Sequence, residues 1–357
     1  MNIRVRKTKK SRIGEVDFEN LGFGEVFSDH MLSIEYRNGK WTSPEIVPFG
    51  KIEILPSLCS LHYGQIVFEG LKAFYTTKGS INVFRPEKYH ERLQRSCERL
   101  CIPVIDFGTF MIGLEALLIL DKDWIPKKKG HSLYIRPFIF GTDNFLGVRT
   151  SESYRFMVIT SPVGAYYKEG MNPIKLLTPG EYVRAMKGGL GTAKTPANYA
   201  SSLLPADEAK RKGFTQVLWL DGIERKYIEE VGTMNVFFLI DNELVTPVLE
   251  GSILDGVTRD TVIRLAKSWG QNVKERRISI DELISASNDG RLKEAFGTGT
   301  AAVISPIGEI HHNNTSMTIN DGITGPFSQK LYDEITGIQY GEKEDEFGWC
   351  YSVGPSG

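Results

Sequence analysis

Segments typical of β-strands alternate along this chain with segments typical of α-helices, and this alternation restricts the chain to a mixed fold. In the first half, β-branched and aromatic residues alternate on both sides of a predicted turn at Lys78 and Gly79. The predicted elements of this half are strands at 66–76, 80–86, 133–141 and 154–164, and helices at 87–100 and 109–124. They predict an α+β domain over residues 1–160.

The second half begins after a stretch rich in Pro, Gly and Tyr, residues 161–173, which is typical of a connection between domains. Pro205 should divide or bend the helical segment that contains it, and Asp241-Asn242 predicts a hairpin turn. The predicted elements are strands at 174–178, 216–222, 225–230 and 234–247, and helices at 257–270, 279–287 and 327–338. A larger α/β domain is therefore expected over 174–357, with a cofactor in the cleft between the domains.

Charge and hydropathy exclude several functional classes. The 357 residues carry 43 basic and 44 acidic side chains, so no strong field would attract nucleic acid or an anionic membrane. No apolar run reaches the length of about 18 residues that a membrane helix needs. The basic start, MNIRVRKTKKSR, lacks a following apolar region and is interpreted as a solvated extension.

The cysteines are too few for a disulfide framework in a chain of this size. Cys97 and Cys101 lie four residues apart on a predicted helix, which would place them on one face without further metal ligands nearby. We expect reduced, buried thiols, no metal site and a cytoplasmic location.

Lys194 follows a glycine-rich run in KGGLGTAKTPANYA, residues 187–200. The stretch is close to a phosphate-binding P-loop, but Ala193 replaces the last glycine and Pro196 follows where a long helix should start. Small neighbours leave space around the amine, as a Schiff-base lysine requires. An ordinary solvated lysine in a loop is the alternative interpretation.

Other segments suggest partners for such a lysine. Glu229 or Glu230, but not both, could meet a protonated pyridine nitrogen, because adjacent strand residues face opposite sides. A phosphate could bind at Gly256-Val257-Thr258, at the turn AFGTGTAA of residues 295–302, or at Arg85. Each of these features alone is common in proteins without such a site.

Taken together, these motifs resemble one family. The stretches LHYGQIVFEGLKAF, FRPEKYHERL, LYIRPF, VGAYY, GLGTAKTPANYA, EVGTMN and FGTGTA, in this order, are similar to those of branched-chain amino acid aminotransferases. The resemblance extends from about Phe23 to Tyr351. It implies the two-domain fold of D-amino acid aminotransferase and aminodeoxychorismate lyase, with pyridoxal 5'-phosphate in the interdomain cleft.

The resemblance also implies roles for individual residues. Lys194 matches the lysine that binds the cofactor as a Schiff base and moves a proton during the reaction. Glu230 matches the carboxylate at the pyridine nitrogen, and Tyr199 matches the tyrosine at the ring oxygen. The positions that match the phosphate-binding residues are Arg85, Val257, Thr258 and Thr300.

For the substrate, the resemblance implies a pocket that accepts two kinds of side chain. Aromatic and aliphatic walls would hold leucine, isoleucine or valine, and Arg136 would hold the distal carboxylate of glutamate or 2-oxoglutarate, in a reversible ping-pong reaction. Leu146 and Val148 match residues that reach the neighbouring subunit's site, which implies a homodimer, and Tyr166 lies in the loop that closes over substrate. The remaining pocket positions are Phe23, Tyr63, Phe68, Tyr134, Thr233 and Ala301.

One departure and two alternatives complete the interpretation. Where some animal members carry a Cys-x-x-Cys pair after the GTGT turn, this chain has AAVISP, so a thiol switch is not expected there. A D-amino acid aminotransferase or an aminodeoxychorismate lyase is the alternative within the same cofactor class. A phosphate-ligand-binding protein without catalysis is the alternative outside it.

Overall fold

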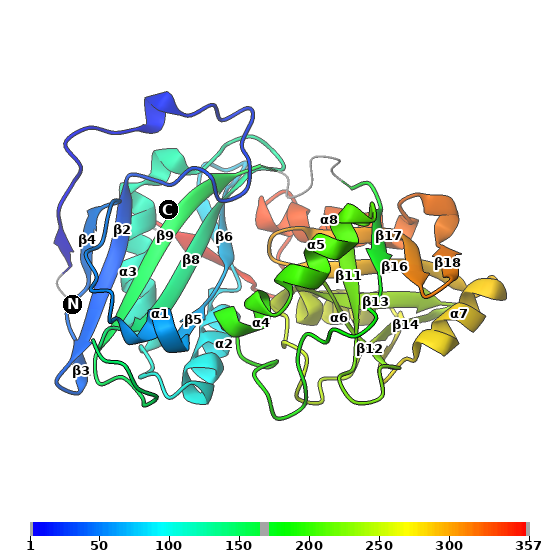
Figure 1. Ribbon diagram of the computed structural model, residues 1–357. Coiled ribbons are helices and arrows are strands. Elements are labelled where there is room, and N and C mark those ends of the chain that lie inside the picture. The colour runs from blue at the N-terminus through cyan, green and yellow to red at the C-terminus, as the bar shows by residue number, and fades with distance from the viewer. Residues whose placement is uncertain (1–2, 165–170, 355–357) are drawn as a thin grey trace. The chain divides into compact units, whose positions relative to one another are not determined.

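The structure, a computed structural model, describes residues 3–164 and 171–354. It contains two compact units (Figure 1). The first unit comprises Met1–Tyr166, Ala193–Pro196 and Gly337–Gly357, and the second comprises Tyr167–Thr192 and Ala197–Thr336. This division differs from the predicted boundaries because two later segments of the chain return to the first unit.

The first unit is built on one large sheet whose strands run in the order β1-β4-β2-β9-β8-β6-β7-β19. Two further strands are attached to it, β3 to β2 and β5 to β8. The last strand, β19, belongs to the C-terminal segment and pairs antiparallel with β7. The strands are β1 (Arg4–Val5), β2 (His30–Arg37), β3 (Lys40–Trp41), β4 (Glu45–Pro48), β5 (Ile66–Phe68), β6 (Leu71–Tyr75), β7 (Ile81–Phe84), β8 (Ser132–Gly141), β9 (Tyr154–Val163) and β19 (Cys350–Val353).

Helices α2 and α3 cover this sheet. The α3 helix packs against β2, β4 and β19, and α2 packs against β5 and α3. Both helices were predicted, and their local signals are present: Pro86 occupies the first turn of α2, and the Asp106 side chain caps α3 by accepting a hydrogen bond from Thr109 N–H. The helical segments of the unit are η1 (Ile13–Glu15), α1 (Cys59–Tyr63), α2 (Pro86–Arg99), α3 (Phe107–Leu120) and η2 (Lys122–Trp124).

The second unit contains a sheet in the order β12-β11-β10-β17-β16-β13-β14-β15, with β18 on β17. An additional pairing of β12 with β13 closes six of these strands into a ring. The strands are β10 (Ile174–Leu177), β11 (Gln216–Leu220), β12 (Ile228–Val231), β13 (Met234–Ile240), β14 (Glu243–Thr246), β15 (Asn272–Glu275), β16 (Leu292–Gly299), β17 (Val303–His312) and β18 (Thr315–Thr318).

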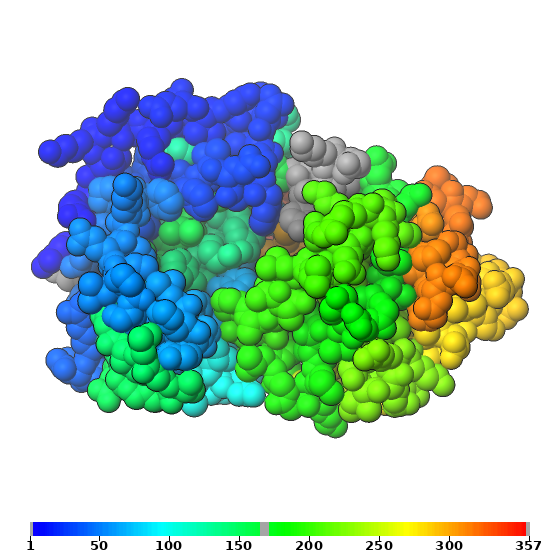
Figure 2. All heavy atoms as spheres, in the orientation of Figure 1, coloured from blue at the N-terminus to red at the C-terminus, as the bar shows by residue number. Residues whose placement is uncertain are grey.

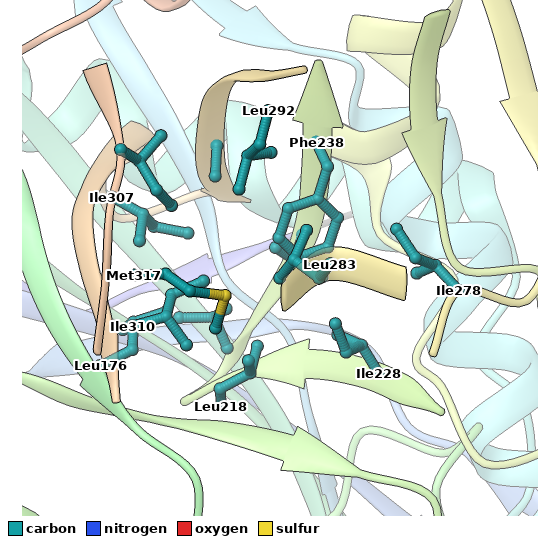
Figure 3. Close-up of a cluster of buried hydrophobic side chains, with 14 of the residues drawn as sticks. Leu176, Leu218, Ile228, Phe238, Ile278, Leu283, Leu292, Ile307, Ile310 and Met317 are labelled. Carbon is teal, nitrogen blue, oxygen red and sulfur yellow. The ribbon is translucent and has the colours of Figure 1, made fainter. Parts of the chain in front are cut away.

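Buried aliphatic side chains from these strands and from α7 form the core of the second unit (Figure 3). Leu218, Phe238 and Leu283 are fully buried members of this cluster. Helix α5 packs against β11, and α6 packs against β15 and β16. The helical segments are α4 (Pro196–Ala200), α5 (Leu203–Arg211), α6 (Val257–Ser268), α7 (Ile280–Asn288), η3 (Asn320–Gly322) and α8 (Pro326–Gln339), of which α4 and α8 cross the boundary between the units.

Most predicted elements of both halves are confirmed, with differences that have local causes. The strand predicted over 66–76 is divided at Glu69 and Gly70 into β5 and β6. Pro205 lies in the first turn of α5, where a missing N–H is tolerated, so the break falls before it. Gly and Pro residues obscured the pattern of β16 and β17, which were not predicted as strands.

The solvated N-terminal extension was a wrong prediction for the described residues. Strand β1 pairs in parallel with β4, and Asp29 accepts hydrogen bonds from the Arg12 backbone N–H (3.0 Å) and the Ser11 hydroxyl (2.5 Å). In Figure 2 the residues before β2, in dark blue, cover the upper surface of the first unit. The basic segment is therefore attached by backbone pairing and by one buried carboxylate.

The prediction that Cys97 and Cys101 share a helix face was also wrong. Helix α2 ends at Arg99, and Cys101 has a left-handed backbone conformation with φ of 54°. Cys97 is buried and Cys101 is exposed. All four cysteines, which lie in the described part of the chain, are free thiols.

These environments predict unequal reactivity of the two thiols. Burial raises the pKa of the Cys97 thiol to about 12, whereas Cys101 is open to solvent. Because the thiolate is the reactive form, iodoacetamide at pH 8 should alkylate Cys101 at least about tenfold faster than Cys97 in the native protein. Peptide mapping by mass spectrometry measures both rates, and guanidinium should equalise them. Equal rates in the native protein would contradict the position of Cys97 in α2.

Candidate functional site

The short segment Ala193–Pro196 attaches Lys194 to the first unit. The Lys194 backbone N–H donates to the Ser96 hydroxyl of α2 at 2.9 Å, and its carbonyl accepts from the Phe68 N–H of β5 at 3.0 Å. The next residue, Thr195, is fully buried and donates its hydroxyl hydrogen to the Ile66 carbonyl at 2.8 Å. Backbone contacts on both sides therefore hold Lys194 in position.

The Lys194 side chain reaches an aromatic and cationic cluster in the same unit. Its Nζ lies 4.9 Å from the centre of the Phe68 ring, and the Arg136 guanidinium carbon lies 4.8 Å from the same centre. Arg136 donates to the Tyr134 hydroxyl at 2.9 Å, and Phe23 meets the Tyr134 ring edge to face at 4.9 Å. The structure thus brings together Lys194 and four of the predicted substrate residues.

Arg136 also retains an unused donor. Its Nε is buried and has no hydrogen-bond partner among the residues that the structure describes. A buried donor without an acceptor is costly, and a bound carboxylate would supply the acceptor. This observation supports an anion-binding role at Arg136.

The bend between β5 and β6 positions this cluster. Glu69, which is buried at the bend, accepts two hydrogen bonds from Arg92 of α2, at 2.8 and 2.9 Å. Gly70 follows, and a Cβ atom there would collide with the Tyr134 hydroxyl. A paired buried charge and a required glycine therefore explain why the chain bends between Phe68 and Leu71.

Arg85, the predicted phosphate residue of the first unit, lies directly before α2 with a left-handed φ of 50°. Its backbone N–H donates to the Trp349 carbonyl at 2.7 Å, and its guanidinium carbon lies 5.1 Å from the centre of the Trp349 ring. A non-glycine residue in this conformation is strained, and such strain concentrates at functional sites. The C-terminal segment thus supports Arg85.

Lys72 is a second lysine of this unit with unusual surroundings. It lies opposite Tyr134 in the pairing of β6 with β8, so the two side chains share a face of the sheet. Burial lowers the pKa of Lys72 to about 8. Sequence analysis did not identify Lys72, because a lysine in a strand shows no sign of its burial.

Other predicted residues of the first unit lie outside this cluster. Tyr63 is exposed at the end of α1, and Leu146 and Val148 are exposed in the loop between β8 and β9. Tyr166 and part of the predicted interdomain connection, 161–173, lie outside the described residues.

In the second unit, Glu230 is a buried carboxylate with cationic and polar partners. It is 4% exposed on β12 and forms an ion pair with Arg184. Asn235, directly opposite on β13, donates its side-chain N–H to Glu230 Oε1 at 3.2 Å. An ionised carboxylate has lone pairs beyond those used here, so Glu230 could also accept from a protonated pyridine nitrogen.

Asn235 connects Glu230 to the start of α6. Its side-chain N–H also donates to the Leu254 carbonyl at 2.8 Å, and a Cβ atom at Gly256 would collide with its Oδ1. Gly256 precedes Val257 and Thr258, the first two residues of the helix, where the helix dipole favours an anion. The predicted phosphate position and the predicted carboxylate thus share one supporting residue.

The remaining predicted residues of this unit lie in turns or in a short helix. Thr300 and Ala301 follow β16 in the turn that leads to β17, and β16 pairs with β13 so that Thr298 faces Asn235. Thr233 is exposed in the two-residue turn between β12 and β13. Tyr199 is half-buried in α4.

Sequence reasoning missed the residues that support the predicted ones. Asn235 could have been noticed, since an amide in the apolar strand MNVFFLI needs a partner. Arg184, Ser96 and Trp349 carry no local signal, because their partners are distant in sequence.

Comparisons with known proteins agree with this residue set. The class IV aminotransferase family model matches residues 66–310. The chain is 54% identical over 354 residues to branched-chain-amino-acid aminotransferase 2 of Bacillus subtilis, covering 99% of this chain and 97% of that protein. It is 50% identical over 339 residues to branched-chain-amino-acid transaminase 1 of the same organism, covering 94% and 95%.

Solved structures show the same fold. The branched-chain amino acid aminotransferase of Escherichia coli superposes with a TM-score of 0.74 at 29% identity, covering 92% of this chain and 99% of that one. A second branched-chain amino acid aminotransferase, from T.th. and solved with pyridoxamine 5'-phosphate, gives a TM-score of 0.74 at 28% identity, covering 90% and 98%. The chain therefore belongs to the class IV aminotransferase family and, within it, to the branched-chain-amino-acid aminotransferases.

Proposed function

We propose that this protein transfers the amino group reversibly between L-leucine, L-isoleucine or L-valine and 2-oxoglutarate. The observation that carries the proposal is the cluster in which Lys194 and Arg136 lie against the same Phe68 ring. It combines an amine for proton transfer, a cation for a carboxylate and an apolar wall. The relatives named above bear the corresponding activity in their names.

Class IV aminotransferases depend on pyridoxal 5'-phosphate, and the residues of this chain fit that group. When bound, the cofactor supplies an electron sink for the carbanion formed at the substrate α-carbon. We assign its pyridine nitrogen to Glu230, its ring oxygen to Tyr199 and its attachment to Lys194. Its phosphate is assigned to Arg85, Val257, Thr258 and Thr300.

Lys194 is proposed to move the proton. Its Nζ would remove the proton from the substrate α-carbon and deliver it again in the second step of transfer. The hydrogen bonds of its backbone to Ser96 and Phe68 keep the base in place during both steps.

The substrate pocket is proposed to serve both partners of a ping-pong cycle. Phe68 and Phe23 would contact the aliphatic side chain, and Arg136 with the Tyr134 hydroxyl would bind the distal carboxylate of glutamate. The unused Nε donor of Arg136 supports this assignment. Tyr63, Tyr166, Thr233 and Ala301 are proposed as further pocket residues on the basis of the family resemblance.

We further propose a homodimer in the cytoplasm. Leu61, Leu146 and Val148 are apolar and highly exposed, the last two at 72% and 88%. The segments that carry them adjoin, because Cys59 N–H donates to the Asp143 carbonyl at 2.9 Å, and they lie side by side at the lower left of Figure 2. A second copy would cover this exposed patch. The free cysteines favour a reducing compartment, and no helix within the described ranges has the length and apolar character of a membrane crossing.

The identity of the cofactor-binding lysine is testable directly. Borohydride reduction fixes the cofactor permanently to the lysine that carries it, and peptide mapping by mass spectrometry identifies that residue. We expect the label on Lys194, and Lys194→Ala should abolish amino transfer from L-leucine to 2-oxoglutarate. The exposed Lys210→Ala serves as control and should keep full activity.

A label on Lys72, the other buried lysine of the first unit, would overturn the assignment. So would full turnover by Lys194→Ala. Amino transfer from D-alanine but not from L-leucine would move the protein to the D-amino acid alternative.

The support of Glu230 predicts a second effect. Asn235→Ala removes a hydrogen bond to a charged group, worth about 1.5–3 kcal/mol, so cofactor affinity and kcat should fall roughly 10- to 100-fold. Asn272→Ala is the matched control, since Asn272 makes an exposed contact to Glu243 on the same unit. Fluorescence titration with cofactor and steady-state kinetics measure both quantities. If the two variants behave alike, Asn235 does not support Glu230 in the way we propose.

The dimer proposal predicts a change of mass. Leu146→Asp combined with Val148→Asp places two charges on the exposed patch and should convert dimer to monomer, because unpaired charges are costly in an interface. Light scattering coupled to size exclusion measures the mass. Ile323→Asp, at an apolar position 63% exposed elsewhere, should leave the mass unchanged. A double variant that remains dimeric would show that the interface lies elsewhere.

A further inference from the structure

A cavity of about 70 Å³ in the second unit lies beside Glu229, the residue next to Glu230. One water occupies about 10–15 Å³ of such volume, so a ligand of roughly five or more non-hydrogen atoms fits, with room at the open side. Adjacent strand residues face opposite sides, so Glu229 and Glu230 serve different sites. Neither Glu230 nor Asn235 lines this cavity.

Glu229 has one carboxylate oxygen without a donor. The side chain is 7% exposed, and its Oε1 accepts a hydrogen bond from the Ser252 hydroxyl. Its Oε2 is buried and has no hydrogen-bond partner within the described residues. Burial raises the pKa of the Glu229 carboxyl, as expected when solvation of the charge is lost. This oxygen therefore lacks the donor that a buried carboxylate requires.

The other charged groups around the cavity have partners of their own. Arg277 forms an ion pair with Glu250 at 2.7 Å and lies over the Tyr227 ring. The Asp221 carboxylate accepts backbone N–H groups of the turn that follows it. None of these contacts satisfies Glu229 Oε2.

The charge balance and the walls of the cavity favour a cation with an apolar part. Three carboxylates, of Asp221, Glu229 and Glu250, face two cations, of Lys187 and Arg277. No group of three or more potential metal ligands occurs in the described ranges, which leaves an organic cation as the matching ligand. The apolar lining consists of Met186, Ile223, Ile228, Pro247, Val248 and Ile253.

We propose that this cavity binds a small aliphatic compound with a primary ammonium group, which donates to Glu229 Oε2 while its hydrocarbon part lies against the apolar walls. Two sources share this chemistry: a free amine, and an apolar amino acid whose carboxylate would meet Lys187. Lys187 is exposed and makes no ion pair with any described residue, so it is available for that contact.

The test uses the holoenzyme in its pyridoxamine form, whose cofactor has no aldehyde to react with amines. Isothermal titration with isobutylamine and, separately, with L-valine measures binding to the wild type, Glu229→Gln and the control Glu181→Gln. Glutamine has the same shape as glutamate and can turn an N–H₂ group toward the ligand, so binding should weaken at least tenfold. Glu181 is exposed and does not line the cavity, so its variant should bind as the wild type does.

A second variant guards against loss of folding. Val248→Phe fills the cavity from its apolar wall and should also weaken binding at least tenfold while Glu229 stays intact. Glu229-dependent binding of isobutylamine supports the free amine as source, and dependence seen only with L-valine supports the amino acid. If neither probe binds, or if binding is the same in Glu229→Gln and the wild type, the proposal is wrong. Binding at the active site would not depend on Glu229 and is recognised by that independence.

Discussion

The two hydrogen bonds of the Lys194 backbone are the contacts on which the candidate active site depends. Ser96 accepts from the Lys194 N–H, and the Lys194 carbonyl accepts from Phe68, so one residue is attached to both a helix and an edge strand of the first unit. A lysine side chain is long and loses much rotational freedom when it is held in one place. Fixing its backbone lowers that cost, because only the side chain must then be ordered. The same contact places the Phe68 ring against the lysine and Arg136.

Buried charge organises the second unit. Glu229 and Glu230 are both buried, which only partners can make tolerable. Arg184 pairs with Glu230 and also donates to the Ser252 carbonyl, while the Ser252 hydroxyl donates to Glu229. One arginine and one serine thus connect two carboxylates that face opposite sides of β12. A change at either carboxylate has a physical route to the other through these contacts.

Local rules predicted the elements whose cause lies within a few residues. Pro86 with the apolar spacing behind it predicted α2, and Asp241-Asn242 predicted the hairpin of β13 and β14. The prediction failed where a distant partner decides. Arg12 and Ser11 look like a solvated tail until Asp29 is found beside them, and Cys101 leaves the helix because α2 stops at Arg99. The apolar pattern of β17 is interrupted by Pro306 and Gly308, so pairing with β16 was not visible.

By itself, the sequence determined the family, the alternation of strands and helices and the position of Lys194 after its glycine-rich run, because motifs and periodicity are properties of neighbouring residues. The tertiary structure alone decided which groups support the predicted residues. Trp349 meets Arg85 only because the C-terminal strand returns to β7, and Asn235 meets Glu230 only because β12 and β13 pair in one register. Sequence distance gives no information about such contacts, since burial and pairing are set by the whole fold.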